Sequence, residues 1–121
     1  MPLIALRGAT VVAVDEPPVV AAATQELLRE LLARNALETT QVVSAFFTCT
    51  DDLASAYPAQ AARDMGWTRV PMLCAADQRV RNAMPRCLRV LLHVHAPDGA
   101  VARHVYLHEA AALRDDLDDA V

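Results

Sequence analysis

The sequence contains no lysine, because all eleven basic residues are arginines. A chain without lysine cannot form a Schiff base with a carbonyl substrate or a pyridoxal cofactor, and it lacks the lysine of a phosphate-binding P-loop. Glycine is also scarce, since Gly8, Gly66 and Gly99 each stand alone. No glycine-rich turn is therefore available to surround the phosphates of a nucleotide with backbone N–H groups. We expect no cofactor of either class.

Cysteine and positive charge are limited as well. Cys49, Cys74 and Cys87 are odd in number and widely spaced, which fits neither a disulfide framework nor a zinc site made of cysteine pairs. The net charge of −4 argues against a broad basic surface for nucleic acid or an acidic membrane. The chain also has no apolar run of membrane-spanning length and no signal-peptide pattern. We expect a cytoplasmic protein that binds neither nucleic acid nor membrane.

The chain length limits the number of hydrophobic cores. A chain of 121 residues can bury one core but is too short for two, so we predict a single domain over residues 1–121. Its polar end, at about 115–121, is expected to be a flexible tail. Apolar residues make up 55% of the chain, which is above the usual range for soluble proteins. This surplus indicates a subunit interface.

The first half of the chain predicts a strand, a helix and a second strand. Branched apolar residues at 3–14 predict a buried strand with a β-bulge at Gly8. Acids and prolines at 15–18 predict a helix start, and the helix is expected to reach about Asn35. The β-branched and aromatic run at 42–50 predicts the second strand. The buried face of the helix is predicted from helical spacing as Val20, Thr24, Leu27, Leu28 and Leu31.

The second half predicts a short helix that ends at Gly66, followed by strands at 70–75 and 87–95. In the last of these, alternation places Arg89 on the face opposite the main core. A turn at 97–99 predicts an antiparallel hairpin. The expected fold class is α+β, with a mixed β-sheet and helices packed on one face.

Two arginines interrupt apolar strand segments: Arg7 in LIALRGAT and Arg89 in CLRVLL. An arginine side chain keeps its charge in proteins, so each needs an anion nearby. For a single strand arginine, an ion pair with one of the 15 acidic residues of the chain is the more common explanation. The alternative is a binding site for an anionic ligand.

Six blocks resemble the small AroH-type chorismate mutases in order and spacing: LRGAT at 6–10, YPAQAAR at 57–63, GWTRVPMLC at 66–74, RCLRVLLH at 86–93, RHVYL at 103–107 and LRDDL at 113–117. Six ordered blocks over nearly the whole chain are far more specific than one short motif. The resemblance implies the bacillus chorismate mutase-like fold, a homotrimer arranged as a pseudo-α/β-barrel. It also implies three active sites in clefts between neighbouring subunits, which would account for the apolar surplus.

The resemblance implies the rearrangement of chorismate to prephenate, a step of aromatic amino acid biosynthesis that needs no cofactor. One C–O bond breaks while a C–C bond forms, so the enzyme has to position its substrate and stabilise charge. By resemblance, Arg89 donates hydrogen bonds to the ether oxygen and to a carboxylate. Arg7 and Tyr106 bind a carboxylate of the dianionic substrate, and Cys74 lines the pocket near the substrate hydroxyl.

By the same resemblance, Asp77 stands where the family usually has a glutamate that interacts with the substrate hydroxyl. Its carboxylate is retracted by about 1.5 Å, enough to turn a direct hydrogen bond into a water-mediated one. Gln60 stands where lysine is common. Other positions border the cleft or its C-terminal lid in the family: Tyr57, Ala59, Arg63, Leu73, Leu113 and Arg114. Two of them, Arg63 and Arg114, are expected to guide the dianion inward.

Three other interpretations stay open on sequence alone. His93 and His95 share a strand face, and His104 and His108 have helical spacing, so a metal site is one of them, although no further ligand is spaced to complete a tetrahedral set. A trimeric imine deaminase of the Rid-like type, which also binds a carboxylate through an interface arginine, is the second. A catalytically weak chorismate-binding paralogue is the third, because Asp77 departs from the family pattern.

Overall fold

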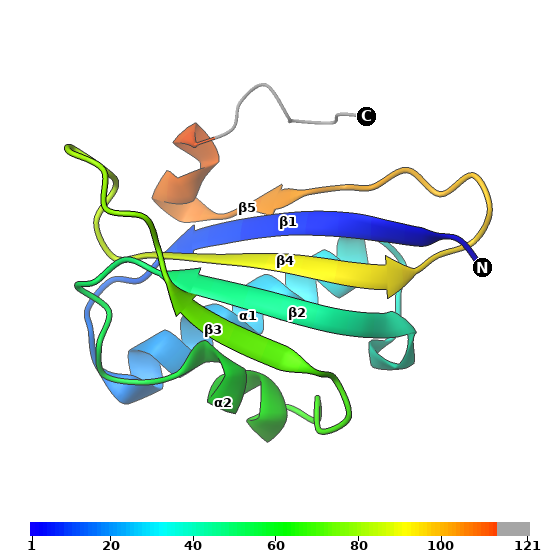
Figure 1. Ribbon diagram of the computed structural model, residues 1–121, viewed down its shortest axis with the longest axis horizontal. Coiled ribbons are helices and arrows are strands. Elements are labelled where there is room, and N and C mark those ends of the chain that lie inside the picture. The colour runs from blue at the N-terminus through cyan, green and yellow to red at the C-terminus, as the bar shows by residue number, and fades with distance from the viewer. Residues whose placement is uncertain (114–121) are drawn as a thin grey trace.

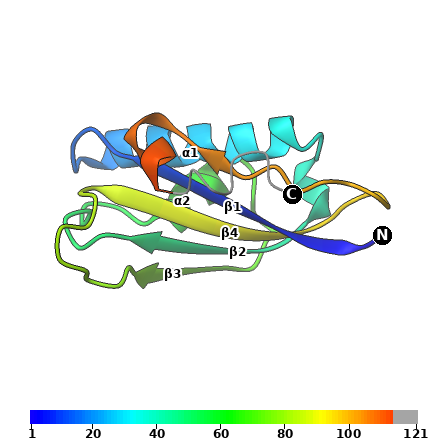
Figure 2. The same ribbon diagram turned by 90° about the horizontal axis from the view of Figure 1, so that it is seen from above.

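The computed structural model describes residues 1–113, and the fold is a mixed five-stranded sheet with its helices on one face (Figures 1 and 2). Arg114 and the tail predicted at about 115–121 lie outside the described residues. The strand order is β3-β2-β4-β1-β5, in which β4 pairs antiparallel with β1 and β2, while β3 and β5 pair parallel with their neighbours. The strands are β1 (Leu3–Val11), β2 (Val42–Cys49), β3 (Met72–Ala76), β4 (Cys87–His95) and β5 (Val105–Tyr106). The helices are α1 (Pro17–Arg34), α2 (Pro58–Asp64) and the 3-10 turns η1 (Thr39–Gln41) and η2 (His108–Ala112).

The α+β prediction, with a mixed sheet covered on one face, is therefore confirmed. Helix α1 begins at Pro17 after the N-cap residue Glu16 and ends before Asn35, close to its predicted bounds. Its buried residues are the five that the spacing predicted: Val20, Thr24, Leu27, Leu28 and Leu31. A fully buried leucine of this kind contributes roughly 2 kcal/mol through the apolar surface that it removes from water. None of the helices among the described residues has the length and apolarity of a transmembrane span.

The prediction of a β-bulge at Gly8 is wrong. The pairing of β1 with β4 runs without interruption from Leu3 to Val11, and the irregularity of the sheet lies in β2, between Val42 and Ser44. A Cβ atom at Gly8 would lie 2.8 Å from Leu31 Cδ1, because α1 packs directly over this point of the sheet. Glycine therefore serves here to let the helix approach the strand closely.

The antiparallel hairpin predicted around residues 97–99 is also wrong. After the turn, the chain passes over β1, and the short strand β5 pairs parallel with β1 through Val105 and Tyr106 (Figure 1). Strand β4 cannot accept a hairpin partner because β1 and β2 already occupy both of its edges. Among the other described strands, β1 and β3 each have a free edge, and the segment pairs with that of β1.

Strand β4 shows how the two faces of the sheet differ. Leu88, Val90, Leu92 and Val94 are at most 4% exposed and point into the core under α1. Arg89 and its same-face neighbours point away from the helices, as the alternation predicted. No helix covers that face (Figure 2), which we call the open face of the sheet.

Candidate active site

The register of the sheet places the predicted site residues of the open face in two adjacent rows. Ala9 pairs with Tyr106 on one side and with Arg89 on the other, so Tyr106 and Arg89 belong to one row across the sheet. Arg7 pairs with Leu91 in the next row. Residues paired across strands share a face, and diagonal neighbours such as Arg7 and Arg89 are about 7–8 Å apart at Cα. Both predicted arginines therefore lie together on the open face.

The guanidinium of Arg89 pairs with the carboxylate of Asp77. Arg89 Nε donates to Asp77 Oδ2 at 2.9 Å, and Nη2 donates to the other carboxylate oxygen. Asp77 is itself held in place by its backbone N–H, which donates to the Cys49 carbonyl at 2.9 Å just beyond the end of β3. The expectation that a strand arginine pairs with an acid of its own chain thus holds for Arg89.

An open cavity lies beside this ion pair. It has a volume of about 290 Å³, and its lining includes Arg89, Asp77, Cys87 and Leu113. The Arg89 side chain remains 40% exposed, whereas that of Asp77 is only 10% exposed. A guanidinium has five N–H donors, and Asp77 takes two of them. Three donors therefore remain for a ligand.

Arg7 and Tyr106 have polar atoms for which the described residues provide no partner. Within residues 1–113, no carboxylate lies within ion-pair distance of the half-buried Arg7 side chain, whose backbone N–H donates to His104 Nδ1 at 3.0 Å. The hydroxyl of Tyr106 is buried and has no hydrogen-bond partner in the same part of the chain. Burying such a group unpaired costs about 1–3 kcal/mol. An anionic ligand on the open face would provide the missing partner for both side chains.

Thr48 is a further candidate that we did not single out in the sequence. It pairs with Arg89 on the side opposite Ala9, so it stands in the same row of the open face. Its hydroxyl oxygen is also buried, and no group of residues 1–113 makes a hydrogen bond with it. The signal in the sequence is a polar residue inside an apolar strand, but the face to which it points depends on the pairing of β2 with β4.

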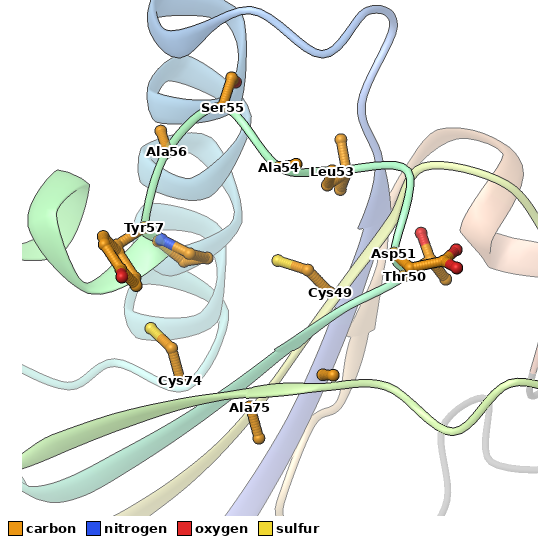
Figure 3. Close-up of a pocket in the computed structure, with 12 residues that line it drawn as sticks. Cys49, Thr50, Asp51, Leu53, Ala54, Ser55, Ala56, Tyr57, Cys74 and Ala75 are labelled. Atoms are coloured by element: carbon orange, nitrogen blue, oxygen red, sulfur yellow. The ribbon is translucent and has the colours of Figure 1, made fainter.

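A second cavity, of about 390 Å³, lies on the other side of the sheet (Figure 3). Cys74 pairs with Phe47, which is buried under the helices, so Cys74 is on the helix side of β3. The lining of this cavity includes Tyr57, which is 72% exposed, and the side chains of Cys49 and Cys74, which Figure 3 shows near one another. The structure thus joins Tyr57 with Cys74, but it separates both from Arg89.

The other predicted positions lie around these two cavities. Arg63 is exposed on α2, where its Nη2 donates to Gln60 Oε1 at 3.1 Å. Leu73 is 64% exposed and pairs with Phe46 on the open face. Ala59 is buried in the core, so its side chain does not line either cavity. Leu113 lines the cavity beside Arg89.

Two cysteines next to the cavities are held as thiols. Burial raises the pKa of Cys49 to about 12, with a further increase from the neighbouring Cys74. Burial also raises the pKa of Cys87, although Arg89 opposes this effect. The thiolate is the nucleophilic form of cysteine, so neither residue is activated for covalent catalysis at neutral pH.

The histidines of the metal-site interpretation make separate contacts. His93 Nδ1 lies 3.1 Å from Ser44 Oγ, and His108 Nε2 lies 3.0 Å from Glu26 Oε1. In the part of the chain that the structure describes, no three histidine, cysteine or acidic side chains come together in a way that could hold a metal ion.

Comparison with known proteins identifies the family. Residues 3–117 match the family model described as chorismate mutase type I. Chorismate mutase AroH of Thermus thermophilus is 44% identical over 118 residues, which are 95% of this chain and 96% of that protein. Chorismate mutase AroH of Bacillus subtilis (strain 168) is 34% identical over 115 residues, 93% and 90% of the two chains.

The fold agrees with this match. The solved chorismate mutase from Clostridium thermocellum superposes with a TM-score of 0.86 at 40% identity, over 90% of this chain and 98% of that one. These relatives do not favour the imine deaminase or the catalytically weak chorismate-binding paralogue. The chain belongs to the type I chorismate mutase family.

Proposed function

We propose that the protein converts chorismate to prephenate in a site on the open face that a neighbouring subunit completes. The observation that carries this proposal is the set of unpaired donors on that face: the Arg7 guanidinium, the buried Tyr106 hydroxyl and three N–H groups of Arg89. Chorismate is a dianion whose ether oxygen gains negative charge as the C–O bond breaks. Donors fixed in a rigid sheet stabilise such charge without reorganising during the reaction.

In this proposal Arg89 is the main catalytic residue. Its free N–H groups point to the ether oxygen and to one carboxylate, while Asp77 holds the guanidinium plane. A preorganised donor of this kind is worth about 3–4 kcal/mol, or roughly a hundred- to a thousandfold in rate. Asp77 has the second role of contacting the substrate hydroxyl with the lone pairs that Arg89 leaves free.

Arg7 and Tyr106 bind the other carboxylate and orient the substrate. Arg7 gives the charge, and Tyr106 gives a directed hydrogen bond from a hydroxyl that is otherwise buried and unpaired. Restricting a flexible substrate to its reactive conformer removes much of the entropic part of the barrier. These two side chains therefore contribute through positioning.

A second subunit is needed because the candidate residues lie on opposite faces of the sheet. Cys74 and Tyr57 line the cavity on the helix side, whereas Arg89, Arg7 and Tyr106 lie on the open face. One small substrate cannot contact both sets within one chain. We propose a homotrimer in which Cys74, Tyr57, Arg63 and Leu73 of one subunit border the site formed by the open-face residues of the next.

The open face also has the apolar character of an interface. Phe46 and Leu73 are 43% and 64% exposed and lie side by side across β2 and β3. Large apolar side chains that are grouped on an uncovered sheet are typical of a subunit contact. Leu113 is proposed to close the outer edge of the site, with Arg63 attracting the dianion.

The proposed compartment is the cytoplasm, because the three cysteines are free and a reducing environment keeps them so. The test of the function is the loss of chorismate, followed by its ultraviolet absorbance, together with the mass of the particle by light scattering. We expect saturable turnover and a mass of three chains. A protein that binds chorismate without turnover, or that turns it over as a monomer, would contradict the corresponding half of the proposal.

A further inference from the structure

One wall of the Cys74 cavity is a stretch of chain without regular secondary structure. It runs from Leu53 to Tyr57, and it faces Cys74 across the cavity (Figure 3). Leu53 is buried in the core and fixes the beginning of the stretch, and the buried Pro58 fixes its end at the start of α2. Between these points the position of the wall depends on its main-chain hydrogen bonds.

The carboxylate of Asp15 makes those bonds. The N–H of Ala54 donates to Asp15 Oδ2 at 3.0 Å, and the N–H of Ser55 donates to Oδ1 at 3.1 Å. Within the described residues, no other main-chain N–H group from Ala54 to Tyr57 donates a hydrogen bond. One acidic side chain, about 40 residues away in the sequence, therefore holds the middle of the wall.

Asp15 is itself well fixed. It lies between the end of β1 and Glu16, the N-cap residue whose carbonyl accepts the N–H groups of Val19 and Val20. The sequence places Asp15 at the start of the helix, and its side chain accepts hydrogen bonds from the wall. Hydrogen bonds from Ser55 and from the Ala54 backbone hold the pKa of Asp15 below its ordinary value, so the carboxylate is charged at neutral pH.

The N–H groups of Ala54 and Ser55 require two separate acceptor atoms on the side chain at position 15. Each carboxylate oxygen accepts one N–H, and such charge-assisted hydrogen bonds are stronger than neutral ones. Asparagine has the same shape but only one oxygen, so its NH₂ group would face one of the two N–H donors. Substitution of Asp15 by asparagine therefore tests the hydrogen bonds with little change in volume.

From this arrangement we infer that Asp15 is a positioning residue for substrate binding, which holds the wall, and with it Tyr57, at a fixed distance from Cys74. The inference rests on the proposed function, because it treats the Cys74 cavity as part of the chorismate site. Asp15 does not line the cavity, so it acts only through the wall. Its loss should weaken substrate binding more than it slows the chemical step on Arg89.

The kinetic test compares Asp15→Asn and Asp15→Ala with the wild-type protein, with Asp98→Asn as the control. Asp98 is exposed in the turn that follows β4 and lies outside the two cavities. We expect KM for chorismate to rise about tenfold in Asp15→Asn, with kcat within about twofold, because one strong hydrogen bond corresponds to roughly this factor. The control should match the wild-type protein. Equal KM values in wild-type protein and both Asp15 variants would overturn the inference.

A second readout does not depend on catalysis. Iodoacetamide alkylates accessible thiols, and peptide mass spectrometry measures the rate at each cysteine. Cys74 is exposed whereas Cys87 is buried, so the alkylation rate of Cys74 reports the access that the wall leaves to the cavity. We expect faster alkylation of Cys74 in Asp15→Asn at a temperature where circular dichroism shows both proteins to be folded. An unchanged rate would overturn the positioning role. If the wild-type protein fails to convert chorismate but the alkylation rates differ, the proposed function fails while the role of Asp15 in the wall stands.

Discussion

Arg89 and Asp77 form a bidentate ion pair next to an open cavity, and the arginine is the more exposed of the two. The Asp77 side chain is only 10% exposed, so separating it from Arg89 would leave a nearly buried carboxylate without its charged partner. Asp77 thus holds the arginine in place before a ligand arrives, and the three N–H donors that Asp77 leaves free belong to a side chain that lines the cavity. This preorganisation is what electrostatic catalysis of a bond rearrangement requires.

Replacement of Arg89 by alanine should reduce kcat by at least about a hundredfold, because the hydrogen bond that we propose from Arg89 to the ether oxygen would strengthen in the transition state. Steady-state kinetics with chorismate measure this change, and light scattering checks that the assembly persists. Arg103→Ala is the control, since Arg103 is exposed beyond the turn after β4 and lies outside both cavities. A kcat close to that of the wild type would remove Arg89 from its proposed role.

Substitutions of Asp77 separate its two roles. Asp77→Glu keeps the charge and extends it toward the substrate hydroxyl, so we expect kcat/KM to be preserved or to rise. Asp77→Asn removes the charge and one of the two acceptors of the Arg89 pair, and we expect kcat to fall about tenfold. Both values come from initial rates of chorismate loss. A steep loss of kcat/KM in Asp77→Glu would show that the loop at 78–86, between β3 and β4, cannot accommodate the longer side chain.

Tyr106→Phe should change binding and stability in opposite directions. The hydroxyl is buried and unpaired in the free chain, so its removal should leave the free energy of unfolding unchanged or raise it by about 1 kcal/mol. KM should rise about tenfold because, in the proposed site, a carboxylate of the substrate would lose its hydrogen bond from Tyr106. Urea unfolding and kinetics on the same preparation measure the two effects. A lower stability together with an unchanged KM would indicate that the hydroxyl has a structural partner instead.

The structure also shows which features depend on local sequence and which on pairing. The five buried residues of α1 follow from their spacing, and Arg89 was placed on the correct face because alternation along one strand is a local property. The position of β5 was mispredicted, since its partner depends on which sheet edge is already occupied. Local sequence around residues 97–107 contains no information about that edge.

The same distinction applies to the site. The resemblance named Arg7, Arg89 and Tyr106, and the register brings these three onto one face. Their separation from Cys74 depends on the pairing of β3 with β2, which a motif does not specify. The contact from Asp15 to Ala54 and Ser55 joins two loops that are distant in the chain, so no spacing rule predicts it.

Because α1 packs closely on Gly8, we predict that even one added methyl group at this position destabilises the fold. The Cβ of alanine would lie 2.8 Å from Leu31 Cδ1 and 3.1 Å from Leu27 Cδ1, and both leucines are fully buried. We expect Gly8→Ala to reduce the free energy of unfolding by about 1–2 kcal/mol in urea denaturation. In a Leu31→Ala background the shorter of these contacts is gone, so the added methyl group should reduce the free energy of unfolding by less. Equal costs in both backgrounds would mean that the helix does not limit this position.

The lowered pKa of Asp52 leads to a prediction of how the stability of the fold depends on pH. A hydrogen bond from the Thr50 hydroxyl, and then one from the Arg86 backbone N–H, hold the pKa of Asp52 below its ordinary value of 3.8. A carboxyl group with a lowered folded-state pKa stabilises the fold above the unfolded-state pKa, and this contribution is lost as the pH falls through the folded-state value. Asp52→Asn should therefore lower the Tm at neutral pH, and the difference from the wild type should shrink as the pH falls below about 4. Thermal unfolding from neutral to acid pH measures this, with Asp98→Asn as the control that should show no such convergence. A Tm difference that stays constant down to acid pH would mean that Asp52 acts through its shape alone.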